Sequence, residues 1–108
     1  DRGVAYFLLE TEGQAAGSMA LERARPDVVY LERLAVLPRF RGRGFGKALV
    51  ARALLEARAM GAQSVGIGVI AGEAGLKDWY RRFGFAETQT RDFPHLPFLV
   101  SFMHCPLR

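Results

Sequence analysis

The stretch LPRFRGRGFGKALV, residues 37–50, decides how the rest of the chain is interpreted. Within it, glycines and cations alternate, and an apolar pattern of helical spacing begins immediately after them (Arg39, Arg41, Gly42, Arg43, Gly44, Gly46 and Lys47). Glycine lets a backbone approach a ligand closely and adopt φ values that other residues avoid. The start of a helix presents unpaired N–H groups and a partial positive charge. The stretch therefore predicts a phosphate-binding loop between a strand and a helix.

Known phosphate motifs can be compared with this stretch. In a Walker loop, the positions of the first glycine and of the final hydroxyl are filled here by Arg41 and Ala48. In the dinucleotide motif, the third glycine is replaced by Lys47 or Leu49, depending on where the motif is started. Arginine- and glycine-rich segments that bind nucleic acid are disordered, whereas this one lies between two regular elements. What remains is the pattern R-x-x-G-x-G over residues 41–46.

The hydrophobic patterns on either side of the loop predict an alternating α/β order. Strands are expected at 4–10, 15–22, 28–37, 64–70, 85–93 and 98–107, and helices at 44–60 and 73–83. Short connections make the first three strands an antiparallel meander. A strand, helix, strand unit over 28–70 predicts a right-handed crossover with parallel strands. Residues 98–105 are apolar on both faces, which favours a central strand in a mixed sheet.

Composition narrows the classes of protein. The 108 residues are enough for a single domain, 1–108, with one core. No apolar run approaches the roughly 20 residues of a membrane helix, and no secretory signal is present, so a cytoplasmic protein without a membrane partner is expected. One cysteine, Cys105, fits a reducing compartment. The net charge of +4 suits a polyanionic partner, such as a phosphorylated cofactor, nucleic acid or a membrane surface.

The pattern filled by Arg41, Gly44 and Gly46 resembles the acetyl-CoA pyrophosphate loop of the GNAT superfamily of N-acetyltransferases. YLERLAVLPRFRGRGFGKALV, residues 30–50, resembles the strand, loop and helix of that family. DWYRRFGF, residues 78–85, resembles its second signature, and SFMHCPL is similar to the last strand of many members. The resemblance implies a GNAT-like acyl-CoA N-acyltransferase fold. It also implies direct acetyl transfer from acetyl-CoA to a primary amine while both substrates are bound.

The resemblance also implies which residues bind the donor. The pyrophosphate would lie over the loop, with Lys47 adding charge (Arg41, Gly42, Arg43, Gly44, Phe45 and Gly46). The backbone of Leu34, Ala35 and Val36 would pair with the pantetheine arm, as an added strand does. The alternative for the loop is a strand-to-helix turn with solvated arginines. The alternative for the three strand residues is ordinary core.

Two residues are candidates for catalysis. Tyr80 matches the family's tyrosine that protonates the departing thiolate, and a phenol is a plausible donor. Its alternative is a tyrosine that packs the short helix. Glu32 can accept the amine proton, directly or through water, although a solvated strand glutamate is an equal interpretation. Strand alternation is expected to place Arg33 on the opposite sheet face from Glu32.

His95, His104 and Cys105 match no ligand spacing, so no metal is expected. A non-catalytic acyl-CoA-binding module lacking a complete acceptor site is the alternative function, and a nucleic-acid-binding domain rests on charge alone. GNAT proteins usually carry another strand and one or two helices before the first strand seen here. These are expected to be absent, removed or supplied by a partner, and a second copy of the chain covering the open sheet edge is one such partner.

Overall fold

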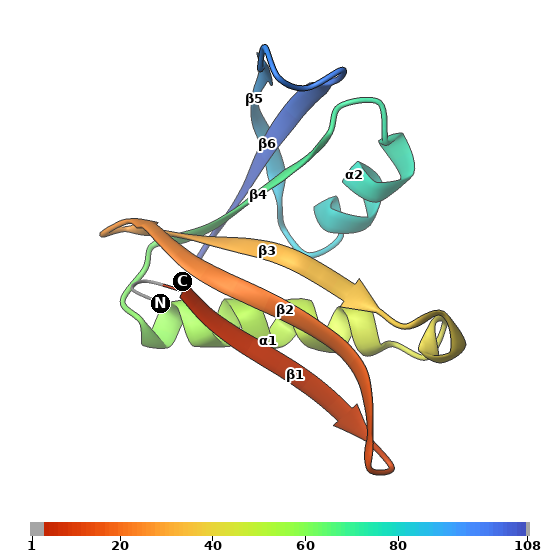
Figure 1. The fold of residues 1–108 in the computed structure, drawn as a ribbon. Helices are drawn as coiled ribbons and strands as arrows, with labels where there is room; N and C mark the ends of the chain where they lie inside the picture. The colour runs from red at the N-terminus through yellow and green to blue at the C-terminus, as the bar shows by residue number, and fades with distance from the viewer. Residues whose placement is uncertain (1–3, 108) are drawn as a thin grey trace.

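The computed structural model describes residues 4–107. One mixed sheet and two α-helices make up this part of the chain, as the sequence predicts (Figure 1). In chain order the elements are β1 Val4–Thr11, β2 Gln14–Arg25, β3 Val28–Val36, a 3-10 turn η1 Pro38–Phe40, α1 Phe45–Ala59, β4 Ser64–Ile70, α2 Ala74–Arg81, β5 Ala86–Asp92 and β6 Leu99–Pro106. Most bounds lie within one or two residues of those expected; the largest difference is in β2, which continues to Arg25 through residues expected to form a loop.

The sheet has the strand order β1-β2-β3-β4-β6-β5. β1, β2 and β3 form the predicted antiparallel meander. β3 and β4 pair in parallel, and α1 connects them in the sequence. β6 pairs with both β4 and β5, which confirms the central position expected from its apolar faces. β1 and β5 are the two edges of the sheet.

Both helices cover the same face of the sheet. Leu49, Val50 and Ala53 of α1 are buried against alternate residues of the strands, and Tyr80 of α2 belongs to the same core. The core-facing strand residues are Met19, Leu21, Val29, Leu31, Val65, Ile67 and Met103. No helix in the described part of the chain covers the opposite face. Side chains on that face, Tyr30 among them, alternate with the buried ones.

A bulge in β3 changes which side chains face the core. Ser18 pairs with Ala35 and Ala20 pairs with Glu32, so one residue of β2 lies opposite two residues of β3. Arg33, one of those two, has φ of 55°. Because the extra residue shifts the phase of alternation, Leu34 packs against the core on the same side as Leu31. Strict alternation predicted that Arg33 lies on the opposite sheet face from Glu32. The bulge breaks that alternation, so this prediction is wrong.

The sheet opens between its two halves. β3 and β4 pair only through 28–30 and 64–66, and beyond these residues the two strands diverge (Figure 1). β3 stays paired with β2, and β4 with β6, so each half remains a regular sheet. The divergence leaves the facing edge of β3 without β4 as a partner over residues 31–36. This opening positions the site described next.

Candidate active site

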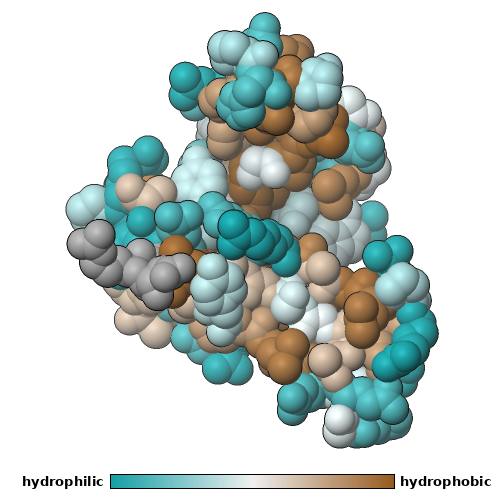
Figure 2. Space-filling model, viewed as in Figure 1, coloured by the Kyte–Doolittle hydropathy of each residue, from teal (hydrophilic) through white to brown (hydrophobic). Residues whose placement is uncertain are grey.

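A cleft of about 520 Å³ lies where β3 and β4 diverge. Its walls come from β3, β4 and α2, with Phe102 of β6 also lining it. In the space-filling view, a band of hydrophilic side chains lies over β3, and apolar surface lies above it over the half that carries β4, β6 and α2 (Figure 2). The volume is that of a small-molecule site. The cleft brings together the two predicted catalytic residues, Glu32 from β3 and Tyr80 from α2.

Tyr80 is held among aromatic rings, and its hydroxyl has no hydrogen-bond partner within residues 4–107. The side chain is 7% exposed and makes edge-to-face contacts with Trp79 and Phe85 at 5.0 and 5.4 Å between ring centroids. Burial raises the pKa of the phenol above its usual value, so the phenol stays protonated at neutral pH. No side-chain polar atom within residues 4–107 is both fully buried and unpartnered. The hydroxyl of Tyr80, which has no protein partner there, is therefore not fully buried, and Tyr80 lines the cleft.

Glu32 has a neighbouring carboxylate on β2. Ala20 lies directly opposite Glu32, so Glu22 is its diagonal neighbour on the same sheet face. Burial raises the pKa of Glu32, and the charge of Glu22 and a hydrogen bond with it raise the pKa further, whereas Arg33 lowers it. Glu32 and Arg33 both line the cleft. A carboxylate whose pKa is moved toward neutrality is a better proton acceptor.

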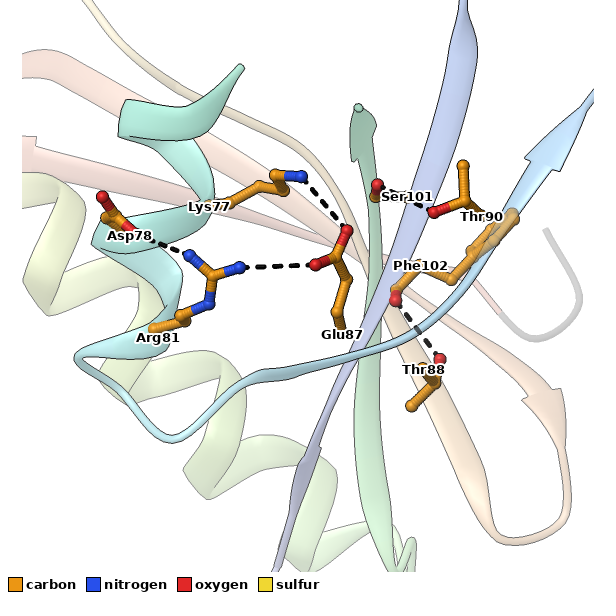
Figure 3. Close-up of polar contacts among 8 residues, drawn as sticks. All are labelled: Lys77, Asp78, Arg81, Glu87, Thr88, Thr90, Ser101 and Phe102. Carbon is orange, nitrogen blue, oxygen red and sulfur yellow. Dashed lines mark hydrogen bonds and ion pairs between the residues drawn. The ribbon is translucent and has the colours of Figure 1, made fainter. Parts of the chain in front are cut away.

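An ion-pair clamp fixes α2, and with it Tyr80, against the outer strand. The carboxylate of Glu87 on β5 accepts from Lys77 at 3.1 Å and from Arg81 at 3.3 Å, both on α2 (Figure 3). A hydrogen bond from Ser101, followed by that from Lys77, lowers the pKa of Glu87. Because Lys77 and Arg81 are four residues apart, they lie on the same face of the helix, and both form ion pairs with the one carboxylate. Tyr80 lies on the helix between them.

The glycine-rich loop has the conformation that the sequence predicts. Gly42 and Gly44 have φ of 78° and 83°, and a Cβ on either would meet nothing within 4 Å. Glycine is required at these two positions by the backbone conformation, because residues with a side chain rarely adopt this φ. Gly46 has a packing requirement instead, since its Cβ would lie 3.3 Å from the Trp79 ring. Gly44 is the N-cap of α1 and no side chain caps the helix, so its first N–H groups remain available to an anion.

The cations around the loop are ordered by contacts with the protein. Arg41 donates its Nε–H to the carbonyl oxygen of Val36 at 3.0 Å, which ties the loop to the end of β3. The Arg43 guanidinium lies over the rings of Phe40 and Phe45, at 5.3 and 5.5 Å from the centroids. Lys47 lines a separate hollow between α1 and α2, beside Trp79 and Arg82.

The strand residues predicted to bind the donor divide between two surfaces. Leu34 lines the cleft. Ala35 and Val36 line a hollow of about 270 Å³ that Arg41 also borders. The sequence interpretation missed Tyr30, which lines the cleft two residues before Glu32. Its position in the strand alternation was the available indication, because Tyr30 and Glu32 share a sheet face.

Residues 4–107 contain neither a metal-binding cluster nor a membrane-spanning helix. No group of three or more His, Cys, Asp and Glu side chains is placed there to hold a metal ion. None of the helices in that range has both the length and the apolar character needed to cross a bilayer.

Comparison with known proteins agrees with this architecture. The profile of the Acetyltransferase (GNAT) family matches residues 1–85. An uncharacterized N-acetyltransferase of Methanocaldococcus jannaschii is 30% identical over 90 residues, which cover 78% of this chain and 40% of that protein. The chain thus spans less than half the length of this curated relative.

Solved structures show the same fold. A GNAT family acetyltransferase of Elizabethkingia anophelis with acetyl-CoA bound superposes with a TM-score of 0.91 at 18% identity, covering 97% of this chain and 77% of that one. An acetyltransferase of Bacillus subtilis in complex with CoA gives 0.85 at 20% identity, covering 98% and 78%. These likenesses confirm the predicted GNAT-like fold. With the family profile matching most of its length, the chain belongs to the GNAT family of acetyltransferases.

Proposed function

We propose that this protein transfers an acetyl group from acetyl-CoA to a primary amine, directly and with both substrates bound together. The observation that carries the proposal is the cleft between β3 and β4, which both Glu32 and Tyr80 line. β3 leads from this cleft straight to the glycine-rich start of α1. One stretch of chain therefore carries both Glu32 and the anion site, and Tyr80 of α2 lines the cleft with Glu32.

The residues present fit acetyl-CoA. The uncapped start of α1 and the left-handed glycines at 42 and 44 suit a pyrophosphate over residues 41–46. Over residues 34–36, β3 has no β4 partner, and its backbone groups there, apart from the Val36 carbonyl that accepts from Arg41, are offered to an amide-containing arm. Bound acetyl-CoA or CoA in structural neighbours supports the same assignment. When bound, acetyl-CoA supplies the activated thioester.

The two cleft residues then have distinct roles in moving protons. Glu32, with its raised pKa, takes a proton from the amine nitrogen, directly or through water. Tyr80, protonated at neutral pH, gives its proton to the departing thiolate. Holding both groups in one cleft replaces encounters in solution by fixed positions.

The test is acetyl transfer to a panel of amines: a diamine, an amino acid, an aminoglycoside and a peptide with a free N-terminus. Thiol release and the mass of the amine product are measured together, with Glu32→Gln as the matched variant. We expect thiol release that requires an amine and slows in Glu32→Gln. Tight binding of acetyl-CoA without turnover on any amine would instead favour the alternative, an acyl-CoA-binding module without a complete acceptor site.

A further inference from the structure

Three side chains form a hydrogen-bonded row on the helix-free face of the sheet. The hydroxyl of Tyr30 on β3 lies 3.5 Å from Nε2 of His104 on β6, and the two rings meet edge to face. On the other side of the imidazole, Nδ1 lies 3.1 Å from Oγ1 of Thr88 on β5. The row begins at Tyr30, which lines the cleft, and ends at Thr88, which is exposed at the sheet edge.

Gly66 of β4 makes this contact possible. A Cβ at this position would lie 2.9 Å from both Nε2 of His104 and Cζ of Tyr30. Residues 30, 66 and 104 are adjacent across β3, β4 and β6, so the two side chains meet over the bare backbone of the strand between them. A glycine inside a central strand weakens the strand, and here it permits a close approach.

The hydrogen-bonding capacity of each group determines which atom donates and which accepts along the row. Thr88 Oγ1 also lies 3.2 Å from the carbonyl oxygen of Phe102, which can only accept, so the single hydroxyl proton of Thr88 goes there. Thr88 must then accept from His104, which places the imidazole proton on Nδ1. Nε2 is left as an acceptor, and the Tyr30 hydroxyl donates to it. The lone pairs of the Tyr30 oxygen remain available to a donor in the cleft.

The surroundings keep His104 neutral. Burial lowers the pKa of His104, and the charge of Arg25 on β2 lowers it further. Within residues 4–107, Tyr30 on β3, Gly66 on β4 and Thr88 on β5 lie against the ring and Ala86 of β5 pairs with His104, and none of these is a carboxylate. At neutral pH the imidazole is therefore uncharged, and its Nε2 can accept a proton.

The proposed reaction needs a second proton acceptor. A primary amine in water carries three protons on nitrogen, and the amide product carries one, so two protons leave the nitrogen. One thiol proton is delivered through Tyr80, and the net reaction releases one proton to solvent. Glu32 can take one of the two protons at a time, which leaves the other without an assigned destination.

We propose that Tyr30 and His104 supply that destination; the proposal rests on the acetyltransferase function proposed above. The N–H bond of the amine breaks as the Tyr30 oxygen takes the proton, while the Tyr30 O–H proton passes to Nε2 of His104. Tyr30 ends as a neutral phenol and His104 as an imidazolium, which then loses a proton to solvent. Tyr30 contacts the amine, and His104 acts through Tyr30 as a positioning residue.

Nitrogen NMR of the histidine rings tests the row without requiring turnover. The chain has only two histidines, so His95→Gln assigns the signals. We expect His104 to carry its proton on Nδ1 and to titrate below the usual histidine pKa, and Thr88→Val to reduce the Nδ1–H population. A wild-type His104 with its proton mainly on Nε2 would overturn the proposal.

Kinetics test the proton transfer itself. We expect Tyr30→Phe and His104→Gln each to lower kcat by about 10- to 100-fold with unchanged acetyl-CoA affinity, and the double variant to lose little more than either alone. In His104→Gln, the fall of kcat/KM as the pH drops through the His104 pKa should disappear, whereas His95→Gln should behave as wild type. Turnover unaffected by His104→Gln would overturn only this inference. Absence of turnover on every amine would overturn it together with the proposed function.

Discussion

At the scale of single residues, the environment of each cleft side chain sets its protonation. Tyr80 is buried among rings and has no hydrogen-bond partner within residues 4–107, so it keeps a proton that it can give away. Burial raises the pKa of Glu32, and the neighbouring carboxylate of Glu22 raises it further. Neighbours therefore shift a phenol and a carboxylate in directions that suit a proton donor and a proton acceptor.

The role assigned to Tyr80 predicts a specific loss in Tyr80→Phe. The substitution removes the hydroxyl and keeps the ring that packs on Trp79 and Phe85. We expect kcat to fall by about 100-fold, the typical effect of losing a general acid, while acetyl-CoA affinity and Tm stay near wild type. Steady-state kinetics, calorimetry and thermal unfolding measure the three quantities.

The matched control is Tyr6→Phe, since Tyr6 is 63% exposed on edge strand β1 and distant in sequence from the cleft residues. It should leave all three quantities unchanged. A purely packing role for Tyr80 predicts the reverse pattern, with a lowered Tm and an unchanged kcat per folded molecule. Equal kcat for Tyr80→Phe and wild type, with chemistry rate-limiting, would remove Tyr80 from the reaction.

At the scale of secondary-structure elements, Glu87 joins α2 to β5. Its folded-state pKa is lowered, so the ionised carboxylate stabilises the folded protein above pH 4.5, and this stabilisation is lost as the pH falls through the folded pKa. Glu87→Gln should therefore lower Tm at pH 7, and the difference from wild type should shrink as the pH falls below 4.5.

Thermal unfolding from pH 7 to pH 3 measures this difference. Glu10→Gln on β1 serves as the control, because Glu10 is exposed and the loss of its charge should change Tm little at either end of the range. A Tm difference for Glu87→Gln that stays constant across the range would mean that the clamp does not depend on the carboxylate charge.

Two glycines of β4 provide a matched pair of substitutions. Gly66→Ala places a methyl group 2.9 Å from Tyr30 and His104, so we expect a loss of about 1–3 kcal/mol in unfolding free energy from overpacking. Gly68→Ala meets Phe102 and Val100 at 3.4 Å, an ordinary contact, and should be neutral or stabilising by about 0.5–1 kcal/mol. Denaturant unfolding compares the two. Equal effects would show that Tyr30 and His104 do not depend on the missing side chain.

At the scale of the whole molecule, the element order and most bounds could be predicted from the sequence. Strand 64–70 agrees with the structure residue for residue, and the glycine-rich loop lies at the start of a helix as expected. The predictions succeeded here because hydrophobic spacing and glycine placement act locally. The predictions of a single domain over 1–108, a homodimer and a cytoplasmic location stay predictions.

The features that escaped sequence interpretation depend on partners far away in the chain. The bulge at Arg33 was visible in principle, because Val29 and Leu31 are followed by Leu34 and Val36, a change in the phase of alternation. The contact between Tyr30 and His104 could not be predicted from the sequence, because it requires β6 to insert beside β4. The cleft likewise follows from where β3 and β4 stop pairing, which no local pattern states.

The central claim is that the glycine-rich loop at the start of α1 binds acetyl-CoA. Calorimetric titration of wild type, Gly44→Val and Gly61→Val with acetyl-CoA tests it most directly. Gly44 and Gly61 both have φ of 83° and open space around a Cβ, and they flank opposite ends of α1. Both substitutions should therefore cost similar stability, about 1–3 kcal/mol of backbone strain. We predict one-to-one binding by wild type and Gly61→Val and no measurable binding by a folded Gly44→Val. Equal affinity of Gly44→Val and wild type, or no binding by wild type, would contradict the claim.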